Sequence, residues 1–268
     1  GHAHLEFLRD RRGVLQEKIS VLDTMPDDAV AFCNGDDDLL HAMTCRQRKV
    51  TFGLSDGCDV RAVDVRDLGD GGSTCTIVAG ARRIPVRIRA YGQHMVYAAL
   101  EGAAVGFVMG LSDEEIERGI AAYKTVGRRG VVTDTGFVTL VDDCYNASPD
   151  AMEATLGVLG TMGDTGRRIA VLGSMLELGD YTEEGHRRAG RAAAEHADVL
   201  YAYGPSADAI ARGAEEKGMT AVHAFTDQNE LVEKLRADAK PGDALLFKGS
   251  RGMRMERALA LFLGEEVE

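Results

Sequence analysis

Two segments in the C-terminal half of the chain carry side chains that could do chemistry. Residues 141–152 read VDDCYNASPDAM, and residues 247–257 read FKGSRGMRMER. Each begins as an apolar strand, breaks into small and charged residues, and then starts a helix. Domains of the α/β class bind ligands at the carboxyl ends of parallel strands, and a helix start adds free backbone N–H groups that suit an anion. Both segments are therefore predicted to present side chains to a ligand at a sheet edge.

The first candidate group consists of Asp142, Asp143, Tyr145 and Asn146. A carboxylate at a strand end can accept hydrogen bonds from a ribose or orient a cation. Alternatively, Asp142 or Asn146 caps the helix that is expected to begin near Pro149. The residue types alone leave these two interpretations equally open.

The second candidate group consists of Lys248, Ser250 and Arg251. Gly249 lets the backbone approach a ligand, the lysine supplies a point charge, and the arginine can bind a carboxylate through two parallel hydrogen bonds. The alternative is a charged loop that caps a helix. Three donors of different types at one edge exceed what capping requires, so a ligand site is favoured.

Other polar residues give weaker signals. The segment 173–179, GSMLELG, could form a ligand wall but is more typical of a structural loop. Lys18 is expected to be a solvated charge and His94 a capping or packing residue. His186, His196 and His223 are expected at surface or helix positions without a catalytic partner. The sequence contains no complete G-x-x-x-x-G-K-[ST] phosphate loop and no H-E-x-x-H zinc motif.

Composition limits the classes of function. The chain has 268 residues, a net charge of −12 and a pI near 5.1, which argues against nucleic acid as the main partner. No apolar run approaches the roughly 20 residues that cross a membrane, so no membrane insertion is expected. The cysteines are odd in number and lack C-x-x-C spacing, which predicts reduced thiols in a cytoplasm. They are Cys33, Cys45, Cys58, Cys75 and Cys144.

The pattern of apolar residues changes near residue 129. Before it, helices are expected at 7–25, 94–109 and 112–124, a short strand at 30–33, and several antiparallel strands within 48–90. Ser112 and Glu115 are spaced as a capping box. After it, strands alternate with helices, which predicts a doubly wound, mostly parallel sheet. The strands are expected at 137–142, 168–173, 198–203, 220–225 and 243–248, and the helices at 149–161, 183–196, 206–217, 227–237 and 252–263.

Taken together, these segments resemble the Mur ligase family. The residues that carry the resemblance run in family order over almost the whole chain: AHLEFL (3–8), the Lys18 helix, NGDD (34–37), Gly127-Arg128, DDCYNASPDAM (142–152), RRIAVLGSMLELG (167–179), His186 and KGSRGMRMER (248–257). The resemblance implies an α/β fold in which 1–128 is the C-terminal part of the central ATP-binding domain and 129–268 is the Rossmann-like C-terminal domain. It also implies that an N-terminal domain and the phosphate loop of the central domain are missing here, so the 268 residues alone are expected to be inactive.

The motifs are most similar to those of the family members that act in peptidoglycan precursor synthesis on UDP-N-acetylmuramoyl-tripeptide. The resemblance implies a cytoplasmic, monomeric enzyme that uses ATP and Mg²⁺ to activate the tripeptide carboxylate as an acyl phosphate. The amine of D-alanyl-D-alanine then attacks this group, and a tetrahedral intermediate collapses to an amide. Two alternatives stay open: a sister amide ligase, such as a folylpolyglutamate or tripeptide synthetase, and a truncated module that binds nucleotide or dipeptide without turnover.

The resemblance also implies roles for single residues. His4 matches a histidine near the magnesium site, and Lys18 matches a lysine that is carbamylated and can then hold a metal. Lys248, Ser250 and Arg251 match the loop that closes on the incoming dipeptide and the reacting groups. The nucleotide is expected to contact Asn34, Asp36, His94, Arg128, Asp143, Tyr145 and Asn146. The chain departs from the family pattern H-N-x-x-N at 94–98, which reads HMVYA and lacks both amides.

Overall fold

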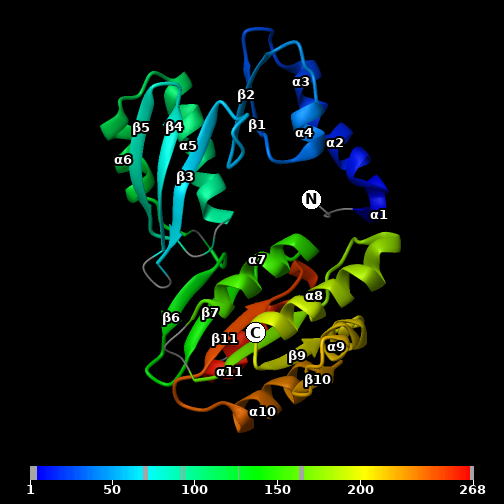
Figure 1. Ribbon diagram of the computed structural model, residues 1–268. Helices are drawn as coiled ribbons and strands as arrows, with labels where there is room; N and C mark the ends of the chain where they lie inside the picture. The colour runs from blue at the N-terminus through cyan, green and yellow to red at the C-terminus, as the bar shows by residue number, and fades with distance from the viewer. Residues whose placement is uncertain are drawn as a thin grey trace. The chain divides into compact units, whose positions relative to one another are not determined.

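The computed structural model of the chain describes residues 5–68, 72–90, 92, 94–125, 127–162 and 166–265. The chain divides into two compact units (Figure 1). The smaller unit is Asp10–Lys124, and the larger unit combines Thr125–Glu268 with Gly1–Arg9. His4 lies outside the described residues. The domain assignment drawn from the resemblance, 1–128 and 129–268, stays a prediction.

The larger unit contains a six-stranded sheet in the order β10-β9-β8-β11-β7-β6. All neighbouring strands pair in parallel except β6 and β7, which are antiparallel. The strands are β6 (Val131–Asp134), β7 (Thr139–Asp143), β8 (Arg168–Gly173), β9 (Val199–Tyr203), β10 (Val222–Phe225) and β11 (Ala244–Lys248). The doubly wound sheet is confirmed, and the predicted strands lie within two residues of the observed ones. Strand β6 was not predicted, because its few apolar residues are only half-buried.

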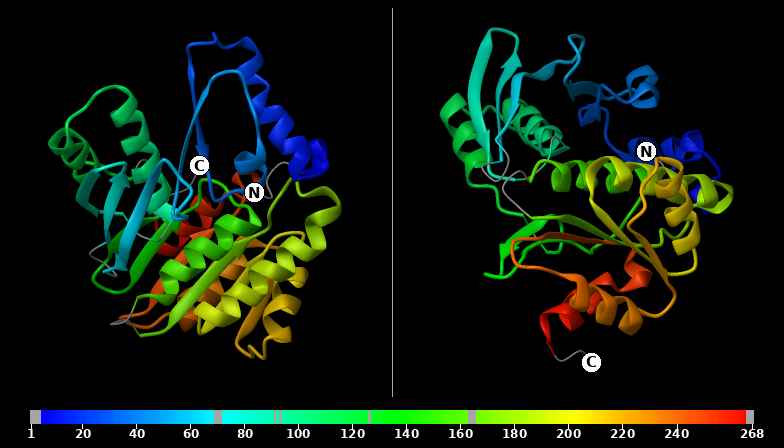
Figure 2. Two further views of the ribbon diagram at one scale, coloured as in Figure 1. Left: turned by 45° about the horizontal axis from the view of Figure 1, so that its top comes forward. Right: turned by 60° about the horizontal axis from the view of Figure 1, so that its bottom comes forward.

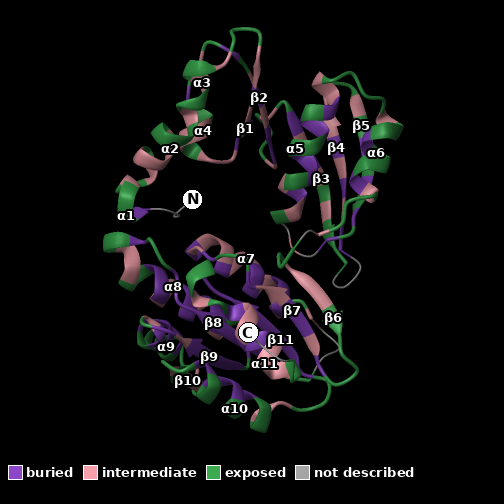
Figure 3. Ribbon diagram, turned by 180° about the vertical axis from the view of Figure 1, so that it is seen from behind, coloured by how far each residue is buried: buried purple, intermediate pink, exposed green. Residues whose placement is uncertain are grey.

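Helices cover both faces of this sheet (Figures 2 and 3). On one face, α7 (Pro149–Gly160), α8 (Thr182–His196) and α9 (Ala207–Glu216) bury residues such as Leu156, Ala193 and Ile210 against Val141 and Leu246 of the strands. On the other face, α10 (Gln228–Asp238) and α11 (Met255–Leu263) pack against the intervening strand residues. Strands buried on both faces need nearly continuous apolar sequence, which is why the short apolar runs predicted them well.

The start of helix α7 is determined by its capping residues. The Ser148 side chain accepts a hydrogen bond from the Ala151 N–H, and Pro149 occupies the first turn, where its missing N–H costs nothing. The N-cap is therefore Ser148, so the alternative in which Asp142 or Asn146 caps this helix is wrong. Both of those residues are left available for other contacts.

The crossing of α8 and α9 depends on two glycines. A Cβ atom at Gly190 would lie 1.9 Å from the Ile210 carbonyl oxygen, and one at Gly213 would lie 2.0 Å from the Arg187 carbonyl oxygen. The helix backbones therefore touch, and no side chain fits between them. Neither glycine has a positive φ, so close approach alone explains both residues.

The smaller unit contains a five-stranded sheet in the order β1-β2-β3-β4-β5. Its strands are β1 (Val30–Asn34), β2 (Arg48–Gly53), β3 (Val60–Asp67), β4 (Ser73–Ala79) and β5 (Arg82–Ile88). Strands β3 to β5 form the expected antiparallel meander, but β2 pairs in parallel with both β1 and β3. The prediction of several antiparallel strands within 48–90 is therefore confirmed for β3 to β5 and does not hold for β2. Alternating burial reports the faces of a strand and not its direction, so the pattern could not single out β2.

Helices α5 (His94–Val108) and α6 (Asp113–Ala121) pack on this sheet and bury residues such as Leu100 and Ile116. The predicted capping box at the start of α6 is present. The predicted helix over 7–25 is broken into α1 (Leu5–Leu8), α2 (Arg11–Ile19) and α3 (Val21–Thr24). The break occurs because Arg9 adopts a φ of 68° and the Asp10 side chain caps α2 by accepting from Gly13 N–H. Helix α4 (Asp38–Ala42) joins β1 to β2.

Helix α1 contacts the loop after β8 in the larger unit. The Glu6 N–H donates to the Glu177 carbonyl oxygen at 3.0 Å, and Leu5 is buried. Gly179, with a φ of +55°, passes so close that an added Cβ would lie 3.0 Å from the Glu6 Cα. The loop between β8 and α8 therefore holds this terminal segment through backbone contact.

The His186 side chain also holds this loop in place through hydrogen bonds. Its Nε2 accepts a hydrogen bond from the Met175 N–H at 2.7 Å, so the proton is on Nδ1, which donates to the Thr182 carbonyl oxygen at 2.6 Å. Of the surface or helix position that was expected, the helix position is confirmed, because His186 lies in α8, but the residue is fully buried and not at the surface. Burial lowers the pKa of His186 below its ordinary value, which keeps the ring neutral and able to accept.

Substituting Gly190 with alanine should destabilise the larger unit by about 2–3 kcal/mol, because the added methyl group overlaps the Ile210 carbonyl. Gly157→Ala is the matched control, since a Cβ there meets nothing within 4 Å, and it should be neutral or stabilise α7 by about 0.5–1 kcal/mol. Urea denaturation followed by circular dichroism measures both effects. Equal stabilities for the two variants would contradict the backbone contact.

Stability should depend on pH through His186. Because the folded-state pKa is lowered from the ordinary 6.5, stability is fully present above that pH and falls as the pH drops below it, by up to about 1.4 kcal/mol per pH unit. A His186→Gln variant, which can keep one donor and one acceptor, should lose this component. Denaturation of both proteins between pH 7.5 and 5 tests the difference, and parallel pH profiles would contradict a neutral buried ring. His186→Leu should be less stable at every pH by about 1–3 kcal/mol, because the Met175 N–H loses its acceptor.

Candidate functional site

The ammonium group of Lys248 and the carboxylate of Asp143 lie together at the carboxyl edge of the six-stranded sheet. The two residues are Cα partners in the pairing of β11 with β7, and the Lys248 Nζ lies 2.5 Å from the Asp143 Oδ2. Their side chains are 4% and 14% exposed. The lysine also donates to the Asn146 carbonyl oxygen at 3.2 Å, and the Thr155 hydroxyl of α7 donates to Asp143 at 2.7 Å.

A buried ion pair of this kind is sensitive to the loss of one member. Removing one partner leaves the other charge buried without compensation, which costs about 3–5 kcal/mol. Lys248 and Asp143 therefore fix each other at the sheet edge. The geometry places a positive charge that is strongly shielded from solvent directly beside the segment 144–147.

Asp142, the neighbour of Asp143, faces a different partner. The Arg128 Nη1 lies 2.7 Å from the Asp142 Oδ2, and the Arg128 carbonyl oxygen accepts from the Tyr145 N–H at 3.2 Å. The Arg129 guanidinium lies 4.0 Å from the centroid of the Tyr145 ring. The arginines that precede β6 are thus attached to the segment after β7, and about half of the Tyr145 surface stays exposed.

A pocket of about 120 Å³ opens next to the Lys248 loop. Ser250 holds one wall in place, because its Oγ accepts from the Leu176 N–H at 2.9 Å and its own N–H donates to the Ser174 carbonyl oxygen at 3.2 Å. The segment 173–179 therefore forms a structural loop and a pocket wall together. The pocket is lined by Asn146, Ala147, Leu176, Glu177, Leu178, Ser250, Arg251 and Gly252.

Arg251 is the exposed cation of this pocket. Its side chain is 67% exposed and lies 3.5 Å from the Glu256 carboxylate at the start of α11. A long guanidinium with such loose contacts can reorient toward a ligand carboxylate at little cost. The pocket thus offers an exposed cation, an amide-bearing residue and a buried hydroxyl.

In the smaller unit, Asn34, Asp36 and the first turn of α5 lie in one neighbourhood. The Asn34 Oδ1 accepts from the Asp36 N–H at 3.0 Å. The Asp36 carboxylate accepts from the N–H groups of Leu54 and Ser55 at 2.6 and 3.1 Å, and from the Tyr97 hydroxyl at 2.9 Å. His94 is exposed and precedes Tyr97 by one helical turn.

These contacts fix the protonation states of the pair. Burial alone would raise the pKa of Asp36, but the hydrogen bonds from Leu54, Ser55 and Tyr97 outweigh it and hold the pKa below its ordinary value. Burial and the neighbouring carboxylate raise the pKa of Tyr97 to about 12. Asp36 is therefore an ionised residue whose carboxylate is already used to join the loops after β1 and β2 to α5.

Lys18 is exposed on α2. Within the described ranges, which leave out His4, no three His, Cys, Asp or Glu side chains gather as a metal-binding group. The expected metal roles of His4 and Lys18 therefore stay predictions. All five cysteines are free, and burial raises the pKa of the Cys144 thiol far above its ordinary value, so Cys144 is an inert core residue.

The structure thus gathers Arg128, Asp143, Tyr145, Asn146, Lys248, Ser250 and Arg251 at one sheet edge in the larger unit, and Asn34, Asp36 and His94 in one region of the smaller unit. Sequence reasoning missed Thr155, Tyr97 and Arg129, which contact expected site residues. An arginine pair directly before a strand was a usable signal for Arg129. A helical threonine or tyrosine gives no signal of its own.

Comparisons with known proteins identify the family of the chain. A family model described as the Mur ligase glutamate ligase domain matches residues 127–251, and one described as the Mur ligase middle domain matches residues 1–106. UDP-N-acetylmuramoyl-tripeptide--D-alanyl-D-alanine ligase of Bacillus subtilis (strain 168) is 31% identical over 264 residues, which cover 96% of this chain and 56% of that protein. The chain therefore spans about half the length of the curated relatives that it matches.

Solved structures lead to the same family. A crystal structure of MurF from Acinetobacter baumannii matches with a TM-score of 0.86 and 26% identity, covering 99% of this chain and 58% of that chain. MurF from Thermotoga maritima, solved in complex with ADP, matches with a TM-score of 0.85 and 27% identity, covering 99% and 60%. With family models on both units and relatives along nearly its whole length, the chain belongs to the Mur ligase family.

Proposed function

We propose that this chain is part of an ATP-dependent amide ligase that adds D-alanyl-D-alanine to UDP-N-acetylmuramoyl-tripeptide. The observation that carries the proposal is the Lys248–Asp143 pair with its adjoining pocket, since both are built from the segments most similar to that ligase. The Bacillus relative is named for this activity, and the two MurF structures are similar along nearly the whole chain, which supports the proposal. Residues 1–128 would belong to the central ATP-binding domain and 129–268 to the C-terminal domain.

In the proposed reaction, the tripeptide carboxylate receives a phosphoryl group from ATP, and the dipeptide amine displaces phosphate. Negative charge grows on the acyl oxygen and on the departing phosphate during this step. A preorganised cation with little solvent around it stabilises such charge more strongly than water does. Lys248 has these properties, and Asp143 and the Asn146 carbonyl oxygen keep its ammonium group in one position.

Arg251, Ser250 and Asn146 would recognise the dipeptide. An arginine binds a carboxylate through two parallel hydrogen bonds, and Arg251 is the exposed cation among the residues that line the pocket. A volume of about 120 Å³ suits small side chains such as the methyl groups of alanine. The Ser250 hydroxyl, which already accepts from Leu176, can donate its proton to a ligand oxygen.

Each unit offers candidate groups for binding a nucleotide. Tyr145 offers an exposed ring stabilised by Arg129, and Arg128 offers a guanidinium held by Asp142. This donor set fits an anionic, aromatic ligand such as ATP. Because Asp36 is occupied by Leu54, Ser55 and Tyr97, we propose that it positions the Asn34 loop and the His94 turn. For Mg²⁺, the proposed ligands are His4 and a carbamylated Lys18, whose modification would convert a cation into an anion.

The protein is proposed to act in the cytoplasm and as a monomer. No helix within the described residues is long and apolar enough to cross a membrane. A sister amide ligase and a binding module without turnover are the alternatives that the following experiment separates.

The longer protein that contains this chain should release phosphate only when ATP, UDP-N-acetylmuramoyl-tripeptide and D-alanyl-D-alanine are all present. Phosphate release and mass spectrometry of the product measure this dependence. Replacing the dipeptide with glutamate or a single amino acid should abolish turnover. Turnover with those replacements would indicate a sister ligase, and nucleotide binding without any turnover would indicate a binding module.

Replacing Lys248 with methionine in that longer protein should lower kcat by about 100-fold or more, because the transition state loses its fixed cation. The KM for ATP should change much less. Steady-state kinetics with saturating dipeptide measure both constants. An unchanged kcat would remove Lys248 from the proposed mechanism.

Two further variants separate catalysis from folding. Lys248→Met leaves Asp143 buried without its cation, so the double variant with Asp143→Asn should recover stability but not kcat. Lys217→Met is the matched surface control, because Lys217 pairs with Glu195 where both side chains are about half exposed, and its kcat should equal that of the unmodified protein.

A further inference from the structure

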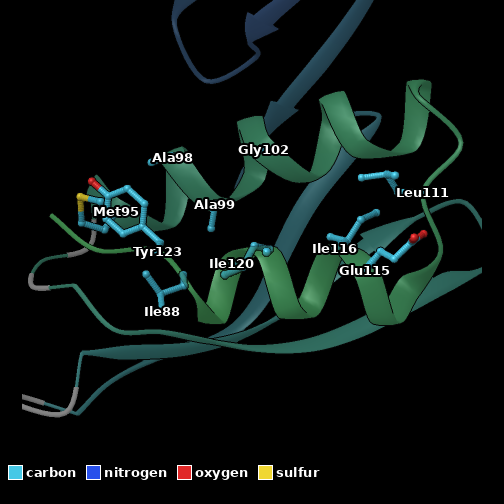
Figure 4. A pocket seen from close by; sticks show the side chains of 11 residues that line it. Ile88, Met95, Ala98, Ala99, Gly102, Leu111, Glu115, Ile116, Ile120 and Tyr123 are labelled. Atoms are coloured by element: carbon cyan, nitrogen blue, oxygen red, sulfur yellow. The ribbon is translucent and has the colours of Figure 1, made fainter. Parts of the chain in front are cut away.

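The two helices that cover the smaller unit's sheet enclose an apolar groove with no place in the proposed reaction. Its volume is about 260 Å³, and it lies between α5, α6 and the end of β5. Figure 4 shows Leu111 and Glu115 at one end and Met95 and Tyr123 at the other. The lining residues are Ile88, Met95, Ala98, Ala99, Gly102, Leu111, Glu115, Ile116, Gly119, Ile120 and Tyr123.

The spacing of these residues explains the groove. On α5 they follow the positions of one helical face, and on α6 they follow the facing stripe. The helices approach each other closely at Gly106, where an added Cβ would lie 3.0 Å from the Ile116 Cγ1. They separate toward Gly102 and Gly119, where an added Cβ would meet nothing within 4 Å.

Gly102 and Gly119 are therefore not explained by packing. A glycine inside a helix is less favourable than alanine unless it allows a close approach or a positive φ, and neither residue has a positive φ. Gly106 has a packing reason, whereas the other two only keep space open. Below them, Ala99, Ile116 and Ile120 form a buried apolar floor.

The size and chemistry of the groove define a ligand. An apolar cavity of about 150 Å³ can admit a benzene-sized molecule, so 260 Å³ suits a bicyclic ring. Met95 and Tyr123 add a sulfur and an aromatic face, both of which make favourable contacts with aromatic rings. Leu111 and Tyr123 are each 41% exposed at the rim, so apolar surface there is left for a ligand to cover.

Charge at one end selects among such ligands. Glu115 is the acidic residue among those that line the groove, and its Oε2 accepts from the Ser112 N–H at 2.8 Å. A carboxylate has lone pairs beyond that single bond. Asp113 and Glu114 lie in the same helical turn, so an anionic ligand would be repelled. The nearby Arg82 is engaged with Asp113 and with the Leu111 carbonyl oxygen.

We propose that this groove binds a small aromatic ammonium compound, with its ring between Gly102 and Gly119 and its ammonium group at Glu115. The ring would lie on Ile116 and Ile120 and displace water from apolar surface. The ammonium group would replace water at an exposed carboxylate.

Titration of the 268-residue chain with tryptamine, followed by NMR line broadening and calorimetry, tests the proposal. We expect a Kd of about 0.1–1 mM, as is usual for a ligand of this size. 3-Methylindole, which lacks the charge, should bind more weakly, and indole-3-propionate, which reverses it, should bind most weakly. Glu115→Gln should remove the preference for tryptamine over 3-methylindole.

Gly102→Leu should weaken tryptamine binding by about tenfold or more, because the new side chain fills the ring position. Gly119→Leu fills the same space from α6 and serves if the first variant does not fold, as judged by circular dichroism. Gly157→Leu is the matched control, since Gly157 is also a helical glycine with open space around its Cβ, and its affinity should be unchanged. No binding to the folded, unmodified chain, or equal affinity in folded groove variants, would overturn the proposal.

Discussion

The proposed catalytic edge depends on one electrostatic contact, the pair between Lys248 and Asp143. Its geometry follows from the sheet, because parallel pairing of β11 with β7 places the two Cα atoms opposite each other. The residues two positions earlier, Leu246 and Val141, belong to the core under α7 and α8. Side chains two residues apart on a strand share a face. Lys248 and Asp143 therefore lie on the same face as this core, and their charge pair lies at its edge. The fold thus places the Lys248 ammonium group at the edge of the sheet, next to an apolar core.

The other loops at this edge are held in place by hydrogen bonds between side chains and backbone groups. The Ser174 hydroxyl accepts a hydrogen bond from the Ser206 N–H and donates one to the Tyr203 carbonyl oxygen. The Ser250 hydroxyl accepts from the Leu176 N–H, and the His186 ring accepts from the Met175 N–H. The loops after β8, β9 and β11 are therefore joined through side chains that satisfy backbone groups. Such bonds restrict the pocket wall without using the charged residues that a substrate would need. Rigid support around a few available cations is what preorganised charge stabilisation requires.

The sequence predicted the layers of the larger unit well and the partners of its charged residues poorly. Short apolar runs between helices specify a parallel sheet almost by themselves, and the sheet then brings Asp143 and Lys248 together. Asp142 and Asp143 are neighbours on one strand, so their side chains face opposite sides of the sheet. A shift of one residue in the strand would therefore exchange their partners. One meets Arg128, and the other meets Lys248 and Thr155. Nor could the sequence place His186 in the core, because an isolated histidine in a polar stretch is usually exposed. The direction of β2 could not be predicted from the sequence either, since it depends on the path of the connection through α4 between β1 and β2.

Asp36 shows how a motif residue can fix the shape of a loop through its own hydrogen bonds. The resemblance to the family implied a nucleotide contact for Asp36, and its oxygens accept from Leu54, Ser55 and Tyr97. Gly53 allows this arrangement, because a Cβ there would lie 2.6 Å from the Asp36 Oδ2. A carboxylate bound in this way can hardly turn toward a ligand without leaving the part-buried Leu54 N–H unsatisfied, at a cost of about 1–3 kcal/mol. The same acid that makes the loop recognisable in sequence is thus the group that fixes the shape of the loop.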